Sequence, residues 1–419
     1  MRRCFRSSVV GLALVLGVLP LSGHAAPSPR LRGADLLPSP TFDAGNGVPG
    51  RSGWALGVGR AETFRNIAEI LPTRRIAASA TPFPLRQTDR SFGVRYAFQG
   101  ATYTLDDFVR RTDTTGLLIL KDDVILYEGY FQGADDKDTF QSFSAGKSFV
   151  STLVGFALAD GKIKSLEDPI AIYLPEVKGS AYEHAKIRDV LQMASGTSYT
   201  EEYEDPDSDI AEFARIADRS EGGLYDFARS FKAKRPPGTQ FYYASTDTEM
   251  LGALVHRVTG QSLSAYMSEK LWKPIGAEAP ARWALDASGA KGREIAAGAL
   301  QITLRDYARF GYLFAHDGMM GAKRVLPAGW VAEATVPRAP YLEYGKLEPN
   351  DPTGYGYQWW CIPDEHRSFT AEGIHGQYVM VDPIQHVVVV KLSAWPEAWD
   401  DVKAAETVAF FEAVTGTLR

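Results

Sequence analysis

Cysteine is almost absent from this chain of 419 residues, which contains only Cys4 and Cys361. Cys4 lies in an N-terminal segment that we expect to be removed, so Cys361 would have no partner and no intramolecular disulfide could form. The stability of the protein must therefore come from a hydrophobic core. We predict that Cys361 is a small buried residue rather than a nucleophile, because no histidine partner is evident in the sequence.

A large excess of either charge is also lacking. The chain carries 45 basic and 51 acidic side chains, a formal charge of −6. This mild acidity argues against nucleic acid as a partner, since binding to phosphates requires a basic surface. Apolar residues make up 45% and charged residues 23% of the chain, which excludes wholesale disorder, collagen-like repeats and coiled coil.

Several common catalytic and binding motifs are missing. The sequence has no His-Glu-x-x-His metal motif, no glycine-rich phosphate loop and no Gly-x-Ser-x-Gly nucleophile elbow. None of the seven histidines has the sequence context of a Ser-His-Asp triad. We therefore expect neither a metal ion nor another cofactor.

The N-terminus has the pattern of a targeting segment. Three of the first six residues are arginines, an apolar run follows at residues 9–21, and small residues at 23–25 offer a cleavage site before Ala26. The run is shorter than the ~20 residues of a membrane span, and the alternative is a buried N-terminal helix. We predict a signal peptide at residues 1–25, a periplasmic or secreted protein, and no membrane span after cleavage. Cleavage would remove three arginines and no acidic residue, which changes the net charge from −6 to −9.

Composition and hydrophobic spacing divide the rest of the chain into segments. Residues 26–85 are rich in Pro, Gly, Arg and Ser, and are predicted to be an N-terminal extension that wraps around the protein or lies loose. Two apolar runs around Lys121-Asp122-Asp123 predict a hairpin. Helical spacing follows over about 144–159, and the chain then looks mostly helical up to about residue 330.

Strand patterns return in the last ninety residues, where Val387-Val388-Val389-Val390 predicts a buried strand, and a helix closes the chain. Strands, then helices, then strands again indicate an α/β layer with a helical insertion. We predict a discontinuous α/β domain at 86–160 and 331–419, interrupted by a mainly helical domain at 161–330.

A Ser-x-x-Lys pattern occurs twice, at Ser144-Ala145-Gly146-Lys147 and at Ser288-Gly289-Ala290-Lys291. The second copy lies in a glycine-rich stretch typical of a turn. Ser144 opens an apolar helix, where residues three apart face the same side and can place an ammonium beside a hydroxyl. The helix N-terminus also supplies N–H groups where negative charge would develop. The alternative is that Ser144 only caps the helix.

A Tyr-x-Ser pattern also occurs twice, at Tyr243-Ala244-Ser245 and Tyr266-Met267-Ser268. Tyr266 lies in an amphipathic segment where a half-buried core tyrosine is the better interpretation. Tyr243 lies in a loop, and loops on rigid scaffolds carry much of protein function. We select Tyr243 as the partner of Ser144 and Lys147, with Tyr242 as the alternative register.

The order of these motifs resembles the serine β-lactamase and DD-peptidase superfamily over about residues 95–415. The longer strings resemble its class C-like branch, which contains esterases and 6-aminohexanoate-dimer hydrolases. Those strings are Met193-Ala194-Ser195-Gly196, Glu201-Glu202-Tyr203-Glu204-Asp205-Pro206, Leu304-Arg305-Asp306-Tyr307-Ala308-Arg309-Phe310-Gly311, Gly373-Ile374-His375-Gly376-Gln377 and Asp382-Pro383. The resemblance implies a β-lactamase/transpeptidase-like α/β (α+β) fold, with an antiparallel sheet flanked by helices and an all-helical insertion.

The resemblance also implies an activity, that of a serine hydrolase cleaving small linear amides or esters through an acyl-enzyme on Ser144. Lys147 and Tyr243 would be the acid–base pair, and the N–H groups of Ser144 and Ile374 the oxyanion hole. Amides like 6-aminohexanoate oligomers are among the expected substrates. The alternatives are a DD-peptidase or penicillin-binding-type enzyme, a β-lactamase, or a non-enzymatic ligand-binding module.

One departure from the family pattern concerns the Lys-Thr-Gly element, which aligns here with Ala371-Glu372-Gly373. The lysine that pairs with a β-lactam carboxylate is then missing, which argues against efficient β-lactam hydrolysis. An alternative register places His375 at that position. His375 would otherwise be a hydrogen-bonding or structural residue beside the site.

Six acidic residues gather at 201–209. They are interpreted either as a solvated acidic loop or as a site where one carboxylate, from Glu202 or Asp205, meets a substrate ammonium. Tyr203 resembles a substrate-contacting tyrosine of the dimer hydrolases, and Ser245 is expected beside the catalytic pair.

Overall fold

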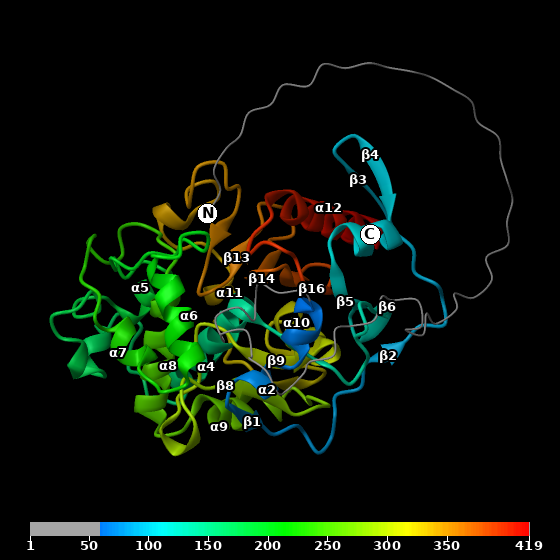
Figure 1. Cartoon of the computed structure of the whole chain (residues 1–419). Coiled ribbons are helices and arrows are strands. Elements are labelled where there is room, and N and C mark those ends of the chain that lie inside the picture. Colours follow the sequence, from blue (N-terminus) through cyan, green and yellow to red (C-terminus); the bar gives the residue numbers. More distant parts are fainter. Residues whose placement is uncertain (1–58, 419) are drawn as a thin grey trace, which may run out of the picture.

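The computed structural model describes residues 59–418, and Figure 1 shows how they are arranged. The predicted signal peptide, with Cys4, and residues 26–58 of the predicted extension lie outside the described residues. Among the residues described, no helix is long and apolar enough to cross a membrane.

An eight-stranded sheet forms the centre of the fold. Its order is β12-β13-β14-β15-β16-β5-β6-β2, and all neighbours pair antiparallel except β2 and β6. In that order the strands are β12 (Gly354–Tyr355), β13 (Trp360–Cys361), β14 (Phe369–Gly373), β15 (Gln377–Asp382), β16 (Val387–Ser393), β5 (Thr114–Lys121), β6 (Val124–Tyr130) and β2 (Arg86–Gln87). The predicted hairpin is the β5–β6 pair, and the predicted valine strand is β16, which is buried along its whole length.

Helices cover both faces of this sheet, so alternate side chains of β5 enter two different cores. Leu118 and Leu120 belong to the core beneath α10 (Leu304–Ala315) and α4 (Lys147–Ala159). Leu117 and Ile119 face α12 (Asp401–Thr417) and α3 (Leu105–Arg111), and a short hairpin of β3 (Arg95–Phe98) and β4 (Ala101–Thr104) extends this side. Figure 1 shows α12 and α10 on opposite sides of the strands.

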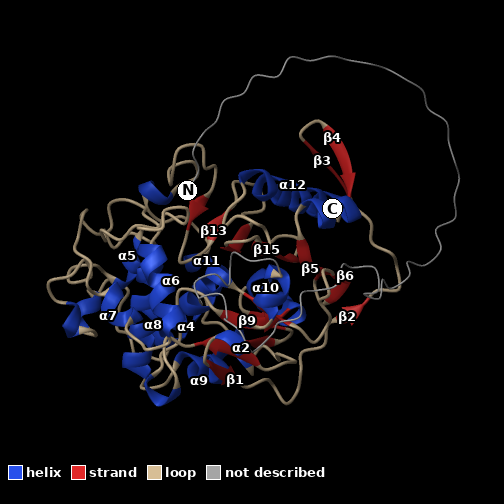
Figure 2. Cartoon of the chain, viewed as in Figure 1, coloured by secondary structure: helices blue, strands red, loops and turns tan. Residues whose placement is uncertain are grey.

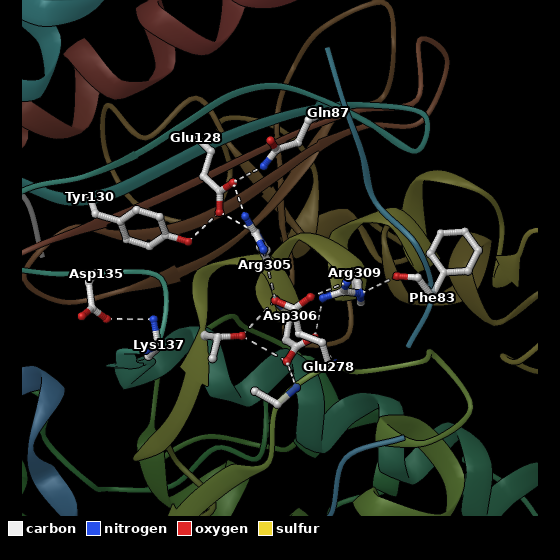
Figure 3. A network of polar contacts seen from close by, with 12 residues as sticks. Phe83, Gln87, Glu128, Tyr130, Asp135, Lys137, Glu278, Arg305, Asp306 and Arg309 are labelled. Atoms are coloured by element: carbon white, nitrogen blue, oxygen red, sulfur yellow. Dashed lines mark hydrogen bonds and ion pairs between the residues drawn. The ribbon is translucent and has the colours of Figure 1, made fainter. Parts of the chain in front are cut away.

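The helix α10 is fastened to its surroundings by an ion-pair network that Figure 3 shows from close by. Arg305 binds the Glu128 carboxylate through two nitrogens, at 2.7 and 2.9 Å. Arg309 binds Asp306 and Glu278, both at 2.8 Å. The string that begins at Leu304, which resembles the family, therefore has a structural role, since it ties α10 to β6 and to the loop before β8.

The segment 161–330 is not wholly helical, which corrects the sequence prediction of an all-helical insertion. Within it, β8 (Ala281–Ala284) and β9 (Leu300–Thr303) form a second antiparallel sheet, with β1 (Thr73–Ile76) on one side and β7 (Thr139–Gln141) on the other. Each strand has only three or four residues, too short for a period of two to be recognised.

Most helices of this segment lie together on one side of the molecule, shown in blue in Figure 2. They are α5 (Ile187–Leu191), α6 (Asp209–Arg219), α7 (Leu224–Ala228), α8 (Ser245–Thr259) and α9 (Leu263–Met267), and a π-helical turn follows at Ser268–Trp272. The remaining short α-helices and strands are α1 (Arg60–Arg65), α2 (Ile67–Ile70), β10 (Met319–Met320), β11 (Lys323–Arg324) and α11 (Trp330–Ala334), and single 3-10 turns lie at Ile170–Ile172, Pro175–Val177, Gly289–Lys291 and Pro340–Leu342. Because β1 pairs with β8, the described part of the N-terminal extension wraps onto the fold.

Candidate active site

Ser144 lies in a single 3-10 turn, Phe143–Gly146, that runs directly into α4. Phe143 has a φ of +44°, in the left-handed region that side chains other than glycine rarely adopt. Such strained residues gather at functional sites, where the surroundings hold them in place. Here the Ser142 hydroxyl donates to Phe143 O at 3.0 Å and accepts from Leu300 N–H at 3.1 Å. Ser144 is not the helix cap that the sequence left open, because Gly146 occupies the N-cap position of α4.

The Lys147 ammonium group lies beside the Ser144 hydroxyl. Its Nζ is 2.9 Å from Ser144 Oγ, 3.1 Å from Ser245 Oγ and 2.7 Å from Ala297 O. The side chain is buried, and burial lowers the pKa of Lys147 to about 8, against the opposing effect of the Glu201 carboxylate. At neutral pH a useful fraction of this lysine is therefore an uncharged amine.

The contacts of Lys147 decide where the lone pair of its neutral form points. Ala297 O can only accept a hydrogen bond, and the Ser245 hydroxyl already donates to Glu201 Oε1 at 2.7 Å. A neutral amine has two hydrogens, so it donates them to these two oxygens. The lone pair is then left for the Ser144 hydroxyl.

Tyr243 lies over the same group, with its ring centroid 5.2 Å from Lys147 Nζ. Its ring stacks on Trp360, with centroids 5.9 Å apart and an interplanar angle of 20°. Burial and the Glu201 carboxylate raise the pKa of Tyr243 well above its usual value, while the Ser144 hydroxyl opposes this. The phenol therefore stays protonated and is a proton donor in the resting site.

Glu201 is a site residue that sequence reasoning missed, since it was grouped with the solvated acids of 201–209. It is buried and accepts hydrogen bonds from Ser245 N at 2.6 Å, Ser245 Oγ at 2.7 Å and Tyr203 Oη at 2.8 Å. It thus holds the first residue of α8 and the tyrosine predicted to contact substrate. Nothing in the local sequence distinguishes Glu201 from its exposed neighbour Glu202.

Ser144 opens onto a cavity of about 350 Å³. Five of the residues that line it are acidic, and none of the lining residues, all within the described part of the chain, is a lysine, arginine or histidine. The acidic residues are Glu201, Glu202, Glu348, Asp351 and Glu372; the others include Tyr203, Tyr242, Tyr243, Trp360 and Trp399. A cavity of this composition favours a cation over an anion.

The end of β14 closes the wall of the cavity beside Ser144. A Cβ atom on Gly373 would lie 2.5 Å from Ser142 O and 3.2 Å from Ala145 N, so only glycine lets the strand approach the turn this closely. Ile374 follows and lines the cavity together with Ser144. The structure thus brings together the two residues predicted to form the oxyanion hole.

Two predicted site residues lie elsewhere. His375 is buried behind the turn, with its Nδ1 2.9 Å from Trp395 O and its ring 5.2 Å from those of Phe64 and Phe143. It does not line the cavity, and burial lowers its pKa to about 4, so its place is structural. Asp205 is exposed, accepts from Asp207 N at 2.9 Å and is also not part of the cavity wall.

The structure also bears on the predictions for Tyr242 and Cys361. Tyr242 reaches the cavity, but its ring packs under the Arg235 guanidinium, 4.1 Å from the centroid, whereas the ring near Lys147 is that of Tyr243. Cys361 is buried and its thiol donates to Thr335 O at 3.2 Å. Burial raises the pKa of this thiol, which suits the predicted inert residue.

Comparison with known proteins places this site in a family. The sequence model of the Beta-lactamase family matches residues 104–412. A 6-aminohexanoate-dimer hydrolase of Paenarthrobacter ureafaciens is 30% identical over 369 residues, which covers 85% of this chain and 89% of that protein. Among solved structures, a putative 6-aminohexanoate-dimer hydrolase from Bacillus anthracis superposes with a TM-score of 0.77 at 22% identity, covering 88% of this chain and 96% of the other.

More distant structures share the fold. A family VIII carboxylesterase has a TM-score of 0.56 at 17% identity and covers 74% of this chain and 96% of its own. The predicted β-lactamase/transpeptidase-like fold, with antiparallel sheets and helices, is thereby confirmed. The chain belongs to the Beta-lactamase family and is a serine hydrolase.

Proposed function

We propose that this enzyme hydrolyses short linear amides and esters that carry an ammonium group, through an acyl-enzyme on Ser144. The proposal rests on the cavity itself. Ser144, hydrogen-bonded to the buried Lys147, lines this cavity together with five carboxylates. The similarity to a 6-aminohexanoate-dimer hydrolase points to the same class, since such a dimer is a linear amide with one free amine.

In the acylation step, Ser144 Oγ attacks the substrate carbonyl carbon and Lys147, as the neutral amine, takes the hydroxyl proton. The lone pair of Nζ faces Ser144. The pKa of Lys147, about 8, is close to the value of an effective general base at neutral pH. The N–H groups of Ser144 and Ile374 would stabilise the oxyanion.

Tyr243 would complete this step as the acid. Its raised pKa keeps the phenol protonated, so it protonates the leaving amine or alkoxide as the carbonyl–heteroatom bond breaks. The proton that Lys147 gained then returns to the phenolate. Water next attacks the acyl-enzyme, gives its proton to the same pair and releases the acid product and Ser144.

Charge would set the choice of substrate. The acidic wall attracts a substrate ammonium and repels a carboxylate that is bound beside Glu372, where β-lactamases of the superfamily bind the β-lactam carboxylate. Glu372 lines the cavity at the place where the sequence alignment puts the threonine of Lys-Thr-Gly, and Ala371 stands at the place of its lysine. We therefore place the DD-peptidase and β-lactamase alternatives below the amidase and esterase activity.

We also propose that residues 1–25 are a cleaved signal peptide and that the enzyme acts in the periplasm or outside the cell. The support is the sequence pattern of the segment, with its arginines, apolar run and small residues. Mass spectrometry of the N-terminus of the exported protein tests this, with Ala26 expected as the first residue and an uncleaved Met1 contradicting it.

The substrate proposal is tested with a matched pair, the p-nitroanilides of 6-aminohexanoate and of hexanoate, which differ only in the ammonium. We expect a higher kcat/KM for the cationic amide, and a preference that shrinks as salt is added. A preference for the neutral amide, or one independent of salt, would contradict the proposal. A chromogenic cephalosporin, a D-Ala-D-Ala peptide and 6-aminohexanoate dimer are assayed alongside, and a cephalosporin or peptide hydrolysed faster than the dimer would favour the alternatives.

A further inference from the structure

A carboxylate and two imidazoles lie close together where three segments of the chain meet, away from the active site. Asp122 is in the turn between β5 and β6, His386 directly precedes β16, and His316 directly follows α10. The backbone N–H of Asp122 donates to His386 O at 2.9 Å, which holds the two turns together. Both residues have a positive φ, 51° and 53°. None of the three lines the active-site cavity.

The three side chains converge on one point. Asp122 Oδ1 lies 3.0 Å from His386 Nδ1 and 3.4 Å from His316 Nε2, and the three ligand atoms are all within 4.8 Å of one another. A tetrahedral zinc ion with bonds of ~2.0–2.1 Å spaces its ligand atoms ~3.3 Å apart. The two distances from Asp122 Oδ1, 3.0 and 3.4 Å, are close to that spacing.

The hydrogen bonds of His316 leave one ring nitrogen facing the carboxylate. Its Nδ1 is 3.0 Å from Tyr312 O, and because a carbonyl only accepts, Nδ1 carries the proton. In a neutral ring, Nε2 then carries no hydrogen and directs its lone pair at Asp122 Oδ1. Two hydrogen-bond acceptors therefore face each other at 3.4 Å. A cation between the two atoms turns the repulsion into two bonds.

We propose that Asp122, His316 and His386 bind a transition-metal cation, zinc by preference. Two imidazoles and one carboxylate suit zinc better than calcium or magnesium, which prefer oxygen ligands, and the Nδ1–H···O=C bond of His316 is the usual support of a histidine ligand. Asp122 Oδ2 faces Lys121 Nζ at 3.4 Å, so the carboxylate binds through Oδ1 alone. A water molecule would fill the fourth position.

The cation can reach this site, because the side chains of Asp122 and His386 are 48% and 43% exposed. Once bound, it would join the β5–β6 turn, the start of β16 and the end of α10. Such a link stabilises the folded chain by a free energy that rises with the logarithm of the free zinc concentration once this exceeds the dissociation constant. The site is separate from the hydrolase chemistry and would add a metal-dependent control of stability.

The test is calorimetric titration of the untagged, chelator-treated protein with zinc chloride. We expect one zinc per chain, a rise of the melting temperature with zinc, and the visible absorption of tetrahedral Co²⁺ when cobalt replaces zinc. Asp122→Asn and His386→Gln should each weaken zinc binding at least ~10-fold. The matched control is His256→Gln, which removes an exposed histidine whose Nδ1 contacts only Gln261 O among the described contacts and should leave the affinity unchanged.

A measurement on the unaltered chain covers the case in which a variant fails to fold. Zinc should protect His386 from diethylpyrocarbonate while His256 remains reactive, as read by peptide mass spectrometry. Absence of saturable zinc binding, equal affinity in the two ligand variants and the control, or equal reactivity of His386 with and without zinc would each overturn the proposal. The pair would then be an ordinary carboxylate–histidine contact.

Discussion

The buried carboxylate of Glu201 should set the pH at which the enzyme becomes active. Ser245 Oγ links the two groups, 3.1 Å from Lys147 Nζ and 2.7 Å from Glu201 Oε1. The charges are thus at most ~6 Å apart, and at an effective dielectric constant of ~20 they attract by ~3 kcal/mol, or ~2 pKa units. This attraction favours the ammonium form of Lys147 and opposes the effect of burial.

Glu201→Gln removes that attraction, so the pKa of Lys147 should fall below its value of about 8. In the unaltered enzyme, kcat/KM for a p-nitrophenyl ester should rise with pH and level off above about 8, since only the neutral amine accepts the serine proton. In the variant, the midpoint of this rise of kcat/KM with pH should move to lower pH by ~1–2 units. The maximal rate is also expected to fall, because the amide cannot accept all three hydrogen bonds.

The assay is kcat/KM between about pH 5.5 and 9.5 at constant ionic strength, corrected for spontaneous hydrolysis. Glu204→Gln is the matched control, since this neighbour is exposed and absent from the cavity wall, and its midpoint should stay in place. An unchanged midpoint for Glu201→Gln would show that Glu201 only positions Ser245. A midpoint moved to higher pH would refute the assignment of Lys147 as the base.

Three further substitutions test the remaining parts of the site. Tyr243→Phe should lower kcat by ~10²–10⁴-fold, typical of a positioned acid, with a far-ultraviolet circular dichroism spectrum like that of the unaltered enzyme; a rate within a factor of a few would remove Tyr243 from the mechanism. Glu202→Gln should raise KM for the 6-aminohexanoate anilide more than for the neutral hexanoate anilide. The control Asp205→Asn, outside the cavity, should change neither KM. Equal effects of the two substitutions would disprove that the Glu202 carboxylate binds the substrate ammonium. Gly373→Ala places a Cβ 2.5 Å from Ser142 O and should cost ~10²-fold in kcat by displacing the nucleophile turn; an unaltered kcat would show that this close packing is dispensable.

The proposed catalytic residues could be selected from the sequence because their spacing is local. Ser144 and Lys147 are one helical turn apart and Tyr243 precedes a helix within a loop, so the Ser-x-x-Lys and Tyr-x-Ser patterns, together with their positions, were enough to select them. The hairpin of β5 and β6 and the valine strand β16 were predictable for the same reason, since continuous apolar runs indicate strands buried on both faces.

The missed features depend on long-range packing. Glu201 becomes a buried acceptor only because the start of α8, forty-four residues later, closes over it. Glu348 and Asp351 reach the cavity from a loop with no helical or strand period. Likewise β1 pairs with a strand about two hundred residues away, and its four residues, of which only Ile76 is apolar, show no strand pattern in the sequence.

The proposed mechanism depends on Ser144 as the nucleophile. Its most direct test is intact-protein and peptide mass spectrometry after reaction with an activated-ester probe. We predict one added acyl group, located on the peptide that contains Ser144, and no adduct in Ser144→Ala. Undiminished labelling of Ser144→Ala, or an adduct confined to another residue in the unaltered enzyme, would contradict the account.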